Sequence, residues 1–239
     1  LAVGGKPRDL VVPAGAHLGT VSGILAERGL IRHPRFFVWM ARLRGKEQAI
    51  RAGEYRIPPG TTPPELLAML VAGRVVQHEL TIVEGWNFRE LRAAVAADPV
   101  LEHTLEGLTA AEVMARLGHS NEHPEGRFFP DTYHFPRGTT DAAFLRRAYA
   151  AMERHLAGAW AERDEGLPYD GPYEALIMAS IVEKETAVPE ERAAIAGVFV
   201  RRLERGMRLQ TDPTVIYGIG PGFDGNIRRR DLREDTPYN

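Results

Sequence analysis

The sequence predicts an α+β fold in which helices outnumber strands. Apolar residues recur at helical spacing in several segments, and short alternating runs lie between glycines and prolines. The order of these segments does not alternate regularly, as a parallel α/β sheet would require. With 239 residues, of which 44% are apolar and 26% charged, the chain is long enough to bury a core.

Composition excludes several functional classes. The 30 basic and 32 acidic residues give a net charge of −2, which argues against a general nucleic-acid-binding protein. The absence of cysteine excludes disulfides, thiol catalysis and cysteine-ligated zinc. No apolar run approaches the length of a membrane span.

The N-terminal part predicts a small subdomain after a glycine-containing lead-in, residues 1–9. Between residues 10 and 57 the expected order is strand, helix, helix, strand, and Gly29 is a natural stop for the first helix. The second helix carries a stripe of Phe36, Phe37, Met40 and Leu43. The expected elements are a strand at 10–12, helices at 18–28 and from 34 onward, and a strand at 54–57.

Capping patterns mark the helices that follow. Thr62, Asn87 and Thr109 each stand three residues before a glutamate, as in a capping box. Gly73 and Gly118 are natural ends for the first and third of these helices. A strand is expected at 75–83.

The C-terminal half is expected to begin with an irregular stretch, residues 119–138. A long amphipathic helix and a Gly/Pro/Tyr linker follow, and then a helix that is apolar nearly all round and therefore expected to be buried. The last thirty residues read as turns and short strand-like pieces. The expected helices are 140–161, 173–185 and 190–206.

The strongest candidate for chemistry is the end of helix 173–185, where Glu183, Lys184 and Glu185 follow one another. At about 100° per residue, Glu185 continues the apolar stripe of Met178 and Ile181, while Glu183 points about 200° away from it. A carboxyl on an apolar stripe near a helix C-terminus should favour its neutral form, as a general acid does. The alternative, a helix that ends in solvated charges, stays open.

Two further segments combine polar and aromatic residues. Residues 125–133 hold carboxylates and rings in a loop, the composition of a carbohydrate groove, although a satellite core would look the same. Residues 210–218 form a polar cluster beside a short apolar run, which could equally be a capped turn. His119 and His123 are four residues apart, but Gly118 and Pro124 disfavour the helix that a metal pair would need. No metal and no cofactor are expected.

Taken together, segments 125–133, 179–186 and 206–218 resemble the YceG-like family of endolytic murein transglycosylases, and residues 235–239 are similar to the start of the family's next motif. In the N-terminal part, residues 12–15, 29–31 and 52–55 are similar to the family's LysM-like subdomain. The resemblance implies a LysM-like subdomain at 10–75 and a helix-rich catalytic domain at 76–239, incomplete at its C-terminus.

The resemblance also implies cleavage of the β-1,4 bond between N-acetylmuramic acid and N-acetylglucosamine within glycan strands, leaving a 1,6-anhydro end. Such an enzyme could terminate nascent strands. The family's catalytic glutamate corresponds to Glu185. The expected substrate-binding residues are Glu125, Asp131, Tyr133, Glu183, Gln210, Asp212, Thr214, Tyr217 and Asn239.

Family members carry a membrane helix before the region matched here, so we expect a single-pass membrane protein with this region on the extracytoplasmic side. Peptidoglycan strands are the expected partner, together with peptidoglycan synthases, and nucleic acid is not. Two alternatives stay open: a non-catalytic peptidoglycan-binding module, and a muramidase-type hydrolase with two carboxylates. A metal-dependent amidase is disfavoured by the poor ligand spacing.

Overall fold

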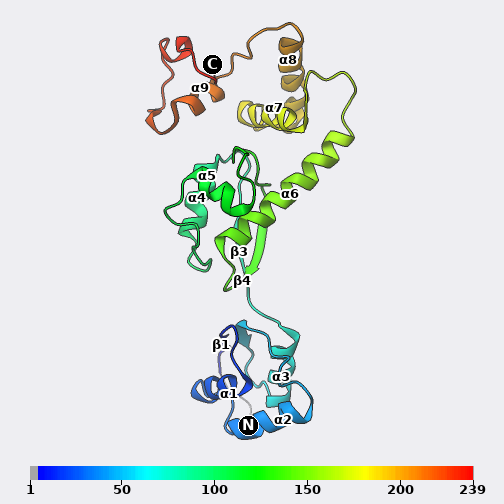
Figure 1. Ribbon diagram of the computed structural model, residues 1–239, viewed down its shortest axis with the longest axis vertical. Helices are drawn as coiled ribbons and strands as arrows, with labels where there is room; N and C mark the ends of the chain where they lie inside the picture. Colours follow the sequence, from blue (N-terminus) through cyan, green and yellow to red (C-terminus); the bar gives the residue numbers. More distant parts are fainter. Residues whose placement is uncertain (1–4, 239) are drawn as a thin grey trace. The chain divides into compact units, whose positions relative to one another are not determined.

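The computed structural model describes residues 5–238 and confirms the α+β prediction (Figure 1). The strands are β1 (Arg8–Val12), β2 (Gly53–Ile57), β3 (Gln77–Thr81) and β4 (Thr132–Pro136). The helices are α1 (Leu18–Glu27), α2 (Pro34–Leu43), α3 (Pro63–Ala72), α4 (Phe88–Ala97), α5 (Ala110–Leu117), α6 (Asp141–Ala161), α7 (Pro172–Glu185), α8 (Arg192–Glu204) and α9 (Asp212–Ile219). Short 3-10 turns are η1 (Pro189–Glu191), η2 (Gly220–Gly222) and η3 (Asp231–Arg233).

The chain forms two compact units that interleave in sequence. The first takes the N-terminal residues up to Leu80, together with Ala97–Thr104 and Thr132–Phe144. The second takes Thr81–Ala96, Leu105–Asp131 and everything from Leu145 onward. There are two two-stranded sheets among the described residues, β1 with β2 and β3 with β4.

The N-terminal unit is built around the antiparallel pair of β1 and β2, in which Leu10 lies opposite Tyr55 and Val11 opposite Glu54. The pleat sends Leu10 and Tyr55 to one face, where both are fully buried against α1, α2 and α3. The Tyr55 hydroxyl donates to the carbonyl oxygens of Arg51 at 2.7 Å and Leu70 at 3.2 Å. The predicted strand–helix–helix–strand order of this region is confirmed.

The predicted capping boxes are all present. The Thr62, Asn87 and Thr109 backbone N–H groups donate to Glu65, Glu90 and Glu112 at 2.8, 2.8 and 2.7 Å. These bonds satisfy helix N-termini that would otherwise need water. Gly73 and Gly118 end their helices in the left-handed region, at φ of 66° and 103°.

Two segments fold differently from the sequence-based expectation. Residues 132–136, expected to be irregular, form β4, because Tyr133 and Phe135 alternate into the core while their neighbours face outward. Residues 212–219, expected as a turn or strand-like piece, form α9. Thr211 precedes this helix, and Pro213 stands within its first turn, where a missing N–H costs nothing.

The prediction that α7 is buried nearly all round is wrong. Only Met178, Ile181 and Val182 are buried, and Ile177 is 46% exposed. The helix packs on α8 and α9, and several positions along its length remain exposed. Within residues 5–238, no helix combines the length and the apolar character that crossing a bilayer demands.

The register of β1 can be tested with two adjacent residues. Leu10→Ala removes a fully buried side chain and should lower the free energy of unfolding of the N-terminal unit by about 2–5 kcal/mol. Val11→Ala on the exposed face should cost less than about 1 kcal/mol. Urea unfolding, monitored by hydrogen exchange in peptides from this unit, measures both changes in the free energy of unfolding. A larger loss for Val11→Ala would mean a strand slipped by one residue.

Candidate active site

Glu125 makes hydrogen bonds to two helices of the second unit through its side chain. One carboxylate oxygen accepts from the backbone N–H of Phe88 at 2.8 Å, and the other accepts from the Tyr217 hydroxyl at 2.9 Å. Phe88 is the first residue of α4, so the carboxylate sits at the positive end of that helix dipole. Glu125 therefore joins α4 to α9, with both of its oxygens occupied.

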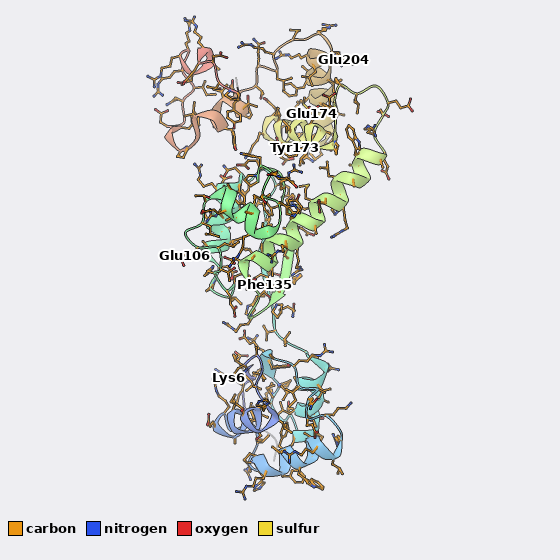
Figure 2. All side chains as sticks on the ribbon, viewed as in Figure 1. Lys6, Glu106, Phe135, Tyr173, Glu174 and Glu204 are labelled. Carbon is orange, nitrogen blue, oxygen red and sulfur yellow. The ribbon has the colours of Figure 1, made fainter. Side chains whose placement is uncertain are left out.

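The loop around Glu125 also holds the start of α7. The Tyr173 hydroxyl donates to the Glu125 carbonyl oxygen at 3.0 Å, and the Arg127 guanidinium lies 3.9 Å from the centre of the Tyr173 ring (Figure 2 labels Tyr173 on α7). Gly126 has φ of 73°, and a Cβ there would come 3.1 Å from the Leu176 side chain. A glycine is thus required both by the backbone and by the closeness of α7.

Close to this loop, the Glu122 carboxylate contacts three side chains. The Tyr149 hydroxyl donates to it at 2.7 Å, Arg127 pairs with it at 3.2 Å, and His119 lies at 3.2 Å while stacking on the Tyr149 ring. The Tyr149 hydrogen bond, with the charges of Arg127 and His119, holds the pKa of Glu122 below its usual value. Burial and the same hydrogen bond raise the pKa of Tyr149, so its hydroxyl stays a donor at neutral pH.

A depression of about 540 Å³ opens beside Glu125. Burial, followed by the hydrogen bond to Glu125, raises the pKa of Tyr217 at its edge, so this hydroxyl also remains protonated. The surface mixes aromatic, cationic and carboxylate groups, a combination suited to a sugar or a peptide. Its lining residues are Phe88, Arg89, Arg92, Ala93, Ala110, His123, Pro124, Glu125 and Tyr217.

Glu185 is the last residue of α7 and is exposed, contrary to the expectation that it continues an apolar surface. Its carboxylate accepts a hydrogen bond from the Thr211 hydroxyl. Thr211 itself is only 5% exposed and stands at the N-cap of α9. A buried hydroxyl thus holds one oxygen of a carboxylate at the protein surface.

The backbone just before α9 is strained. Gln210 has φ of 54°, the one positive value among the described non-glycine residues. This left-handed residue turns the chain immediately before Thr211. The Thr214 hydroxyl then donates to the Thr211 carbonyl oxygen at 2.9 Å and closes the first turn. Strain of this kind persists only where surrounding contacts fix the backbone, and it is often found at functional sites.

The other charges at the end of α7 point to different partners. Glu183 pairs with Arg192 of α8 at 3.1 Å. The Lys184 side chain lies across Gly85, where a Cβ would come 3.2 Å from its Nζ. Glu185 is therefore the carboxylate of this trio that is both exposed and held by a neutral donor.

The structure brings some of the predicted site residues together and separates others. Glu125 contacts Tyr217, while Thr214 contacts the residue that holds Glu185. Tyr133 is buried and packs edge-on against Phe144 in the first unit. Exposed positions are taken by Asp131, Gln210 and Asp212, and Asn239 lies outside the described residues.

Sequence reasoning missed Thr211 and Tyr173. A signal for Thr211 was available, because a threonine before Asp-Pro is a typical helix start. Nothing in the sequence marks Tyr173, whose role depends on a contact across 48 positions. Within residues 5–238, no three histidine, aspartate or glutamate side chains gather closely enough to hold a metal ion.

Comparison with known proteins places these features in a context. A family model described as the YceG-like family matches residues 10–239. An endolytic murein transglycosylase of Bacillus subtilis (strain 168) is 26% identical over 248 residues, covering 97% of this chain and 68% of that protein. The protein of the same name from Streptococcus pneumoniae serotype 2 (strain D39 / NCTC 7466) is 27% identical over 263 residues, covering 95% of this chain and 47% of the relative.

The chain thus spans about two thirds of the Bacillus relative and about half of the Streptococcus relative. Among solved structures, a yceG-like protein from Listeria monocytogenes superposes with a TM-score of 0.52 at 26% identity. That match covers 98% of this chain and 82% of the other.

The Glu122 cluster predicts a specific pH dependence. Because the pKa of Glu122 is lowered in the folded state, its contribution to stability is present above its unfolded pKa of about 4.3 and is lost as the pH falls through the folded value. Glu122→Gln should therefore be less stable than the parent at pH 7. The difference in stability between the two proteins should shrink as the pH falls toward 3. Thermal unfolding between pH 3 and 7 measures it. An equal gap at every pH would contradict the assignment.

Proposed function

Because this chain belongs to the YceG-like family, we propose that it is an endolytic murein transglycosylase, the activity after which its Bacillus and Streptococcus relatives are named. The bond cleaved in this proposal is the β-1,4 link between N-acetylmuramic acid and N-acetylglucosamine. The new end is a 1,6-anhydro sugar, and cleavage of nascent strands would end their growth.

The observation that carries the proposal is the pairing of Glu185 with Thr211. A general acid must reach the substrate and hold a fixed orientation. Glu185 is exposed at the end of α7, and the Thr211 hydroxyl occupies one of its oxygens. The remaining oxygen is free to carry the proton toward a glycosidic oxygen.

The reaction balances with this single carboxyl group. Glu185 gives its proton to the departing glycosidic oxygen as the bond from C1 to that oxygen breaks. The C6 hydroxyl of the same muramic acid attacks C1, and its proton passes to the Glu185 carboxylate. Because the attacking hydroxyl belongs to the substrate, its effective concentration is high and no bound water is required.

A hydrolase of the muramidase type needs a second carboxylate to attack the sugar or activate water. Two of the candidate carboxylates are already engaged by protein groups. Glu183 pairs with Arg192, and both oxygens of Glu125 accept hydrogen bonds. Neither Glu183 nor Glu125 is therefore offered as that second carboxylate, and the proposal relies on intramolecular attack by the substrate.

Thr211 is a positioning residue in this scheme, since it acts through Glu185. Its hydroxyl donates to the carboxyl group in both protonation states, so it can hold the side chain through both proton transfers. The left-handed Gln210 and the Thr214 bond fix Thr211 in turn. The proposed substrate contacts are Gln210, Asp212, Thr214, Asp131, Glu183, Glu125, Tyr217 and Asn239, and the buried Tyr133 is not among them.

The proposed substrate also sets the place of action. Murein lies outside the cytoplasmic membrane, so we propose that this domain works on the extracytoplasmic side, attached to the membrane by a segment other than those described. Peptidoglycan synthases are proposed neighbours, because they would supply the strands that this enzyme cuts.

Glu185→Gln should lower the release of anhydro-muropeptides from purified sacculi by about 10²–10⁴-fold, the usual contribution of a general acid. Mass spectrometry of the digest by the full-length enzyme measures it. Glu204→Gln, an exposed change at the end of α8, is the matched control and should keep full activity. Reducing ends without the anhydro ring would indicate a hydrolase. Sacculus binding with no turnover in the parent would indicate a binding module.

Thr211→Val keeps the shape of the side chain and removes the hydroxyl. Because a hydrogen bond to a charged group contributes about 1.5–3 kcal/mol, kcat should fall by about 10- to 100-fold with KM little changed. Thr211→Ser restores the hydroxyl and should recover most of the rate. A purely structural role would instead lower the thermal stability of both variants without separating their kcat values.

A further inference from the structure

Helix α2 has an apolar arc wider than the surface that buries it. Phe37, Met40 and Ala41 face the core of the N-terminal unit. The rest of the arc is open: Phe36 is 55% exposed, Trp39 58% and Leu43 71%. At about 100° per residue these three side chains lie within roughly 60° of one another, on one face. We call them the α2 face.

The α2 face is contiguous rather than a scatter of single residues. The Phe36 and Trp39 rings lie with their centroids 5.8 Å apart at a tilt of 34°. Leu43 follows Trp39 by one helical turn on the same side. Large apolar side chains exposed together on one face mark an interaction surface.

The surroundings of the α2 face carry one sign of charge. From residue 28 to residue 46 the chain has basic residues and no acidic residue, although the whole chain has a net charge of −2. All of these cations are exposed, and none has an ion-pair partner among residues 5–238. They are Arg28, Arg32, Arg35, Arg42, Arg44 and Lys46.

A shallow depression of about 330 Å³ is lined by Trp39 and by Ser22 of α1. Arg35 and Arg42 line it together with the apolar side chains of Pro34 and Val38. Two guanidinium groups can each bind a phosphate through paired N–H donors. The depression therefore combines an apolar lining with cationic groups.

We propose that the α2 face rests on a bilayer containing anionic phospholipid. Phe36, Trp39 and Leu43 enter the boundary between headgroups and acyl chains, and Arg35 and Arg42 contact lipid phosphates. An exposed aromatic and leucine face beside basic residues is the pattern of helices that lie in a membrane interface. This inference does not depend on the proposed transglycosylase activity.

The chemistry of α2 favours lipid over glycan. Sugar-binding surfaces surround their aromatic rings with carboxylates and amides that bind hydroxyl groups. The helix segment PRFFVWMARL offers neither, and its polar side chains are all arginine. Electrostatic attraction to anionic headgroups amounts to about 1 kcal/mol for each basic residue near the surface.

The test uses the 239-residue chain with Trp86 and Trp160 replaced by phenylalanine, so that all tryptophan fluorescence comes from Trp39. It should sediment with vesicles of phosphatidylcholine and phosphatidylglycerol but not with phosphatidylcholine alone, and Trp39 emission should shift to the blue. Arg35→Gln with Arg42→Gln should weaken binding about 30-fold. Trp39→Ala should weaken it at least about tenfold.

The matched control is Arg201→Gln with Arg205→Gln, which makes the same change in net charge near the end of α8 and should bind as the parent does. Circular dichroism checks that each variant is folded. Absence of binding to the anionic vesicles would overturn the proposal. Binding to purified sacculi alone, lost in Trp39→Ala, would overturn it in favour of a glycan surface. Complete competition by millimolar inorganic phosphate would reduce the site to one for free anions.

Discussion

The hydrogen bonds of Glu125 are the constraint on which the second unit depends. Its carboxylate accepts hydrogen bonds from the first N–H of α4 and from the Tyr217 hydroxyl of α9. Its backbone carbonyl accepts one from the Tyr173 hydroxyl of α7. One loop residue thereby fixes three helices. Because α7 ends in Glu185 and α9 begins at Thr211, the pair that carries the proposed chemistry inherits its geometry from this loop.

Local signals in the sequence predicted most of the fold. The capping boxes at Thr62, Asn87 and Thr109 and the glycine stops at Gly73 and Gly118 correspond to real helix ends, because caps are satisfied within a few residues of one another. The strand–helix–helix–strand order of the N-terminal unit was predicted from apolar spacing and from glycine and proline boundaries, which are also local signals. The long α6 followed from its own amphipathic spacing.

What escaped prediction depends on contacts between distant segments. Periodicity put Glu185 on an apolar stripe of α7; Met178 and Ile181 of that stripe are buried, but Glu185 at its end is exposed. β4 was hidden in a stretch rich in glycine and proline, because its strand character comes from pairing with β3. The motif resemblance singled out Glu125, but its hydrogen bonds to the Phe88 N–H and the Tyr217 hydroxyl join segments 37 and 92 positions away, which no spacing rule predicts.

The left-handed Gln210 has a consequence for how this sequence can vary. A β-branched side chain is strongly disfavoured at φ of 54°, whereas glycine or asparagine adopts that backbone readily. The peptide unit that follows carries Thr211, so the choice of residue 210 sets how firmly the hydroxyl is aimed. The residue at position 210 can therefore influence the orientation of Glu185 through Thr211. We expect fewer residue types to be tolerated at this position than its solvent exposure alone would suggest.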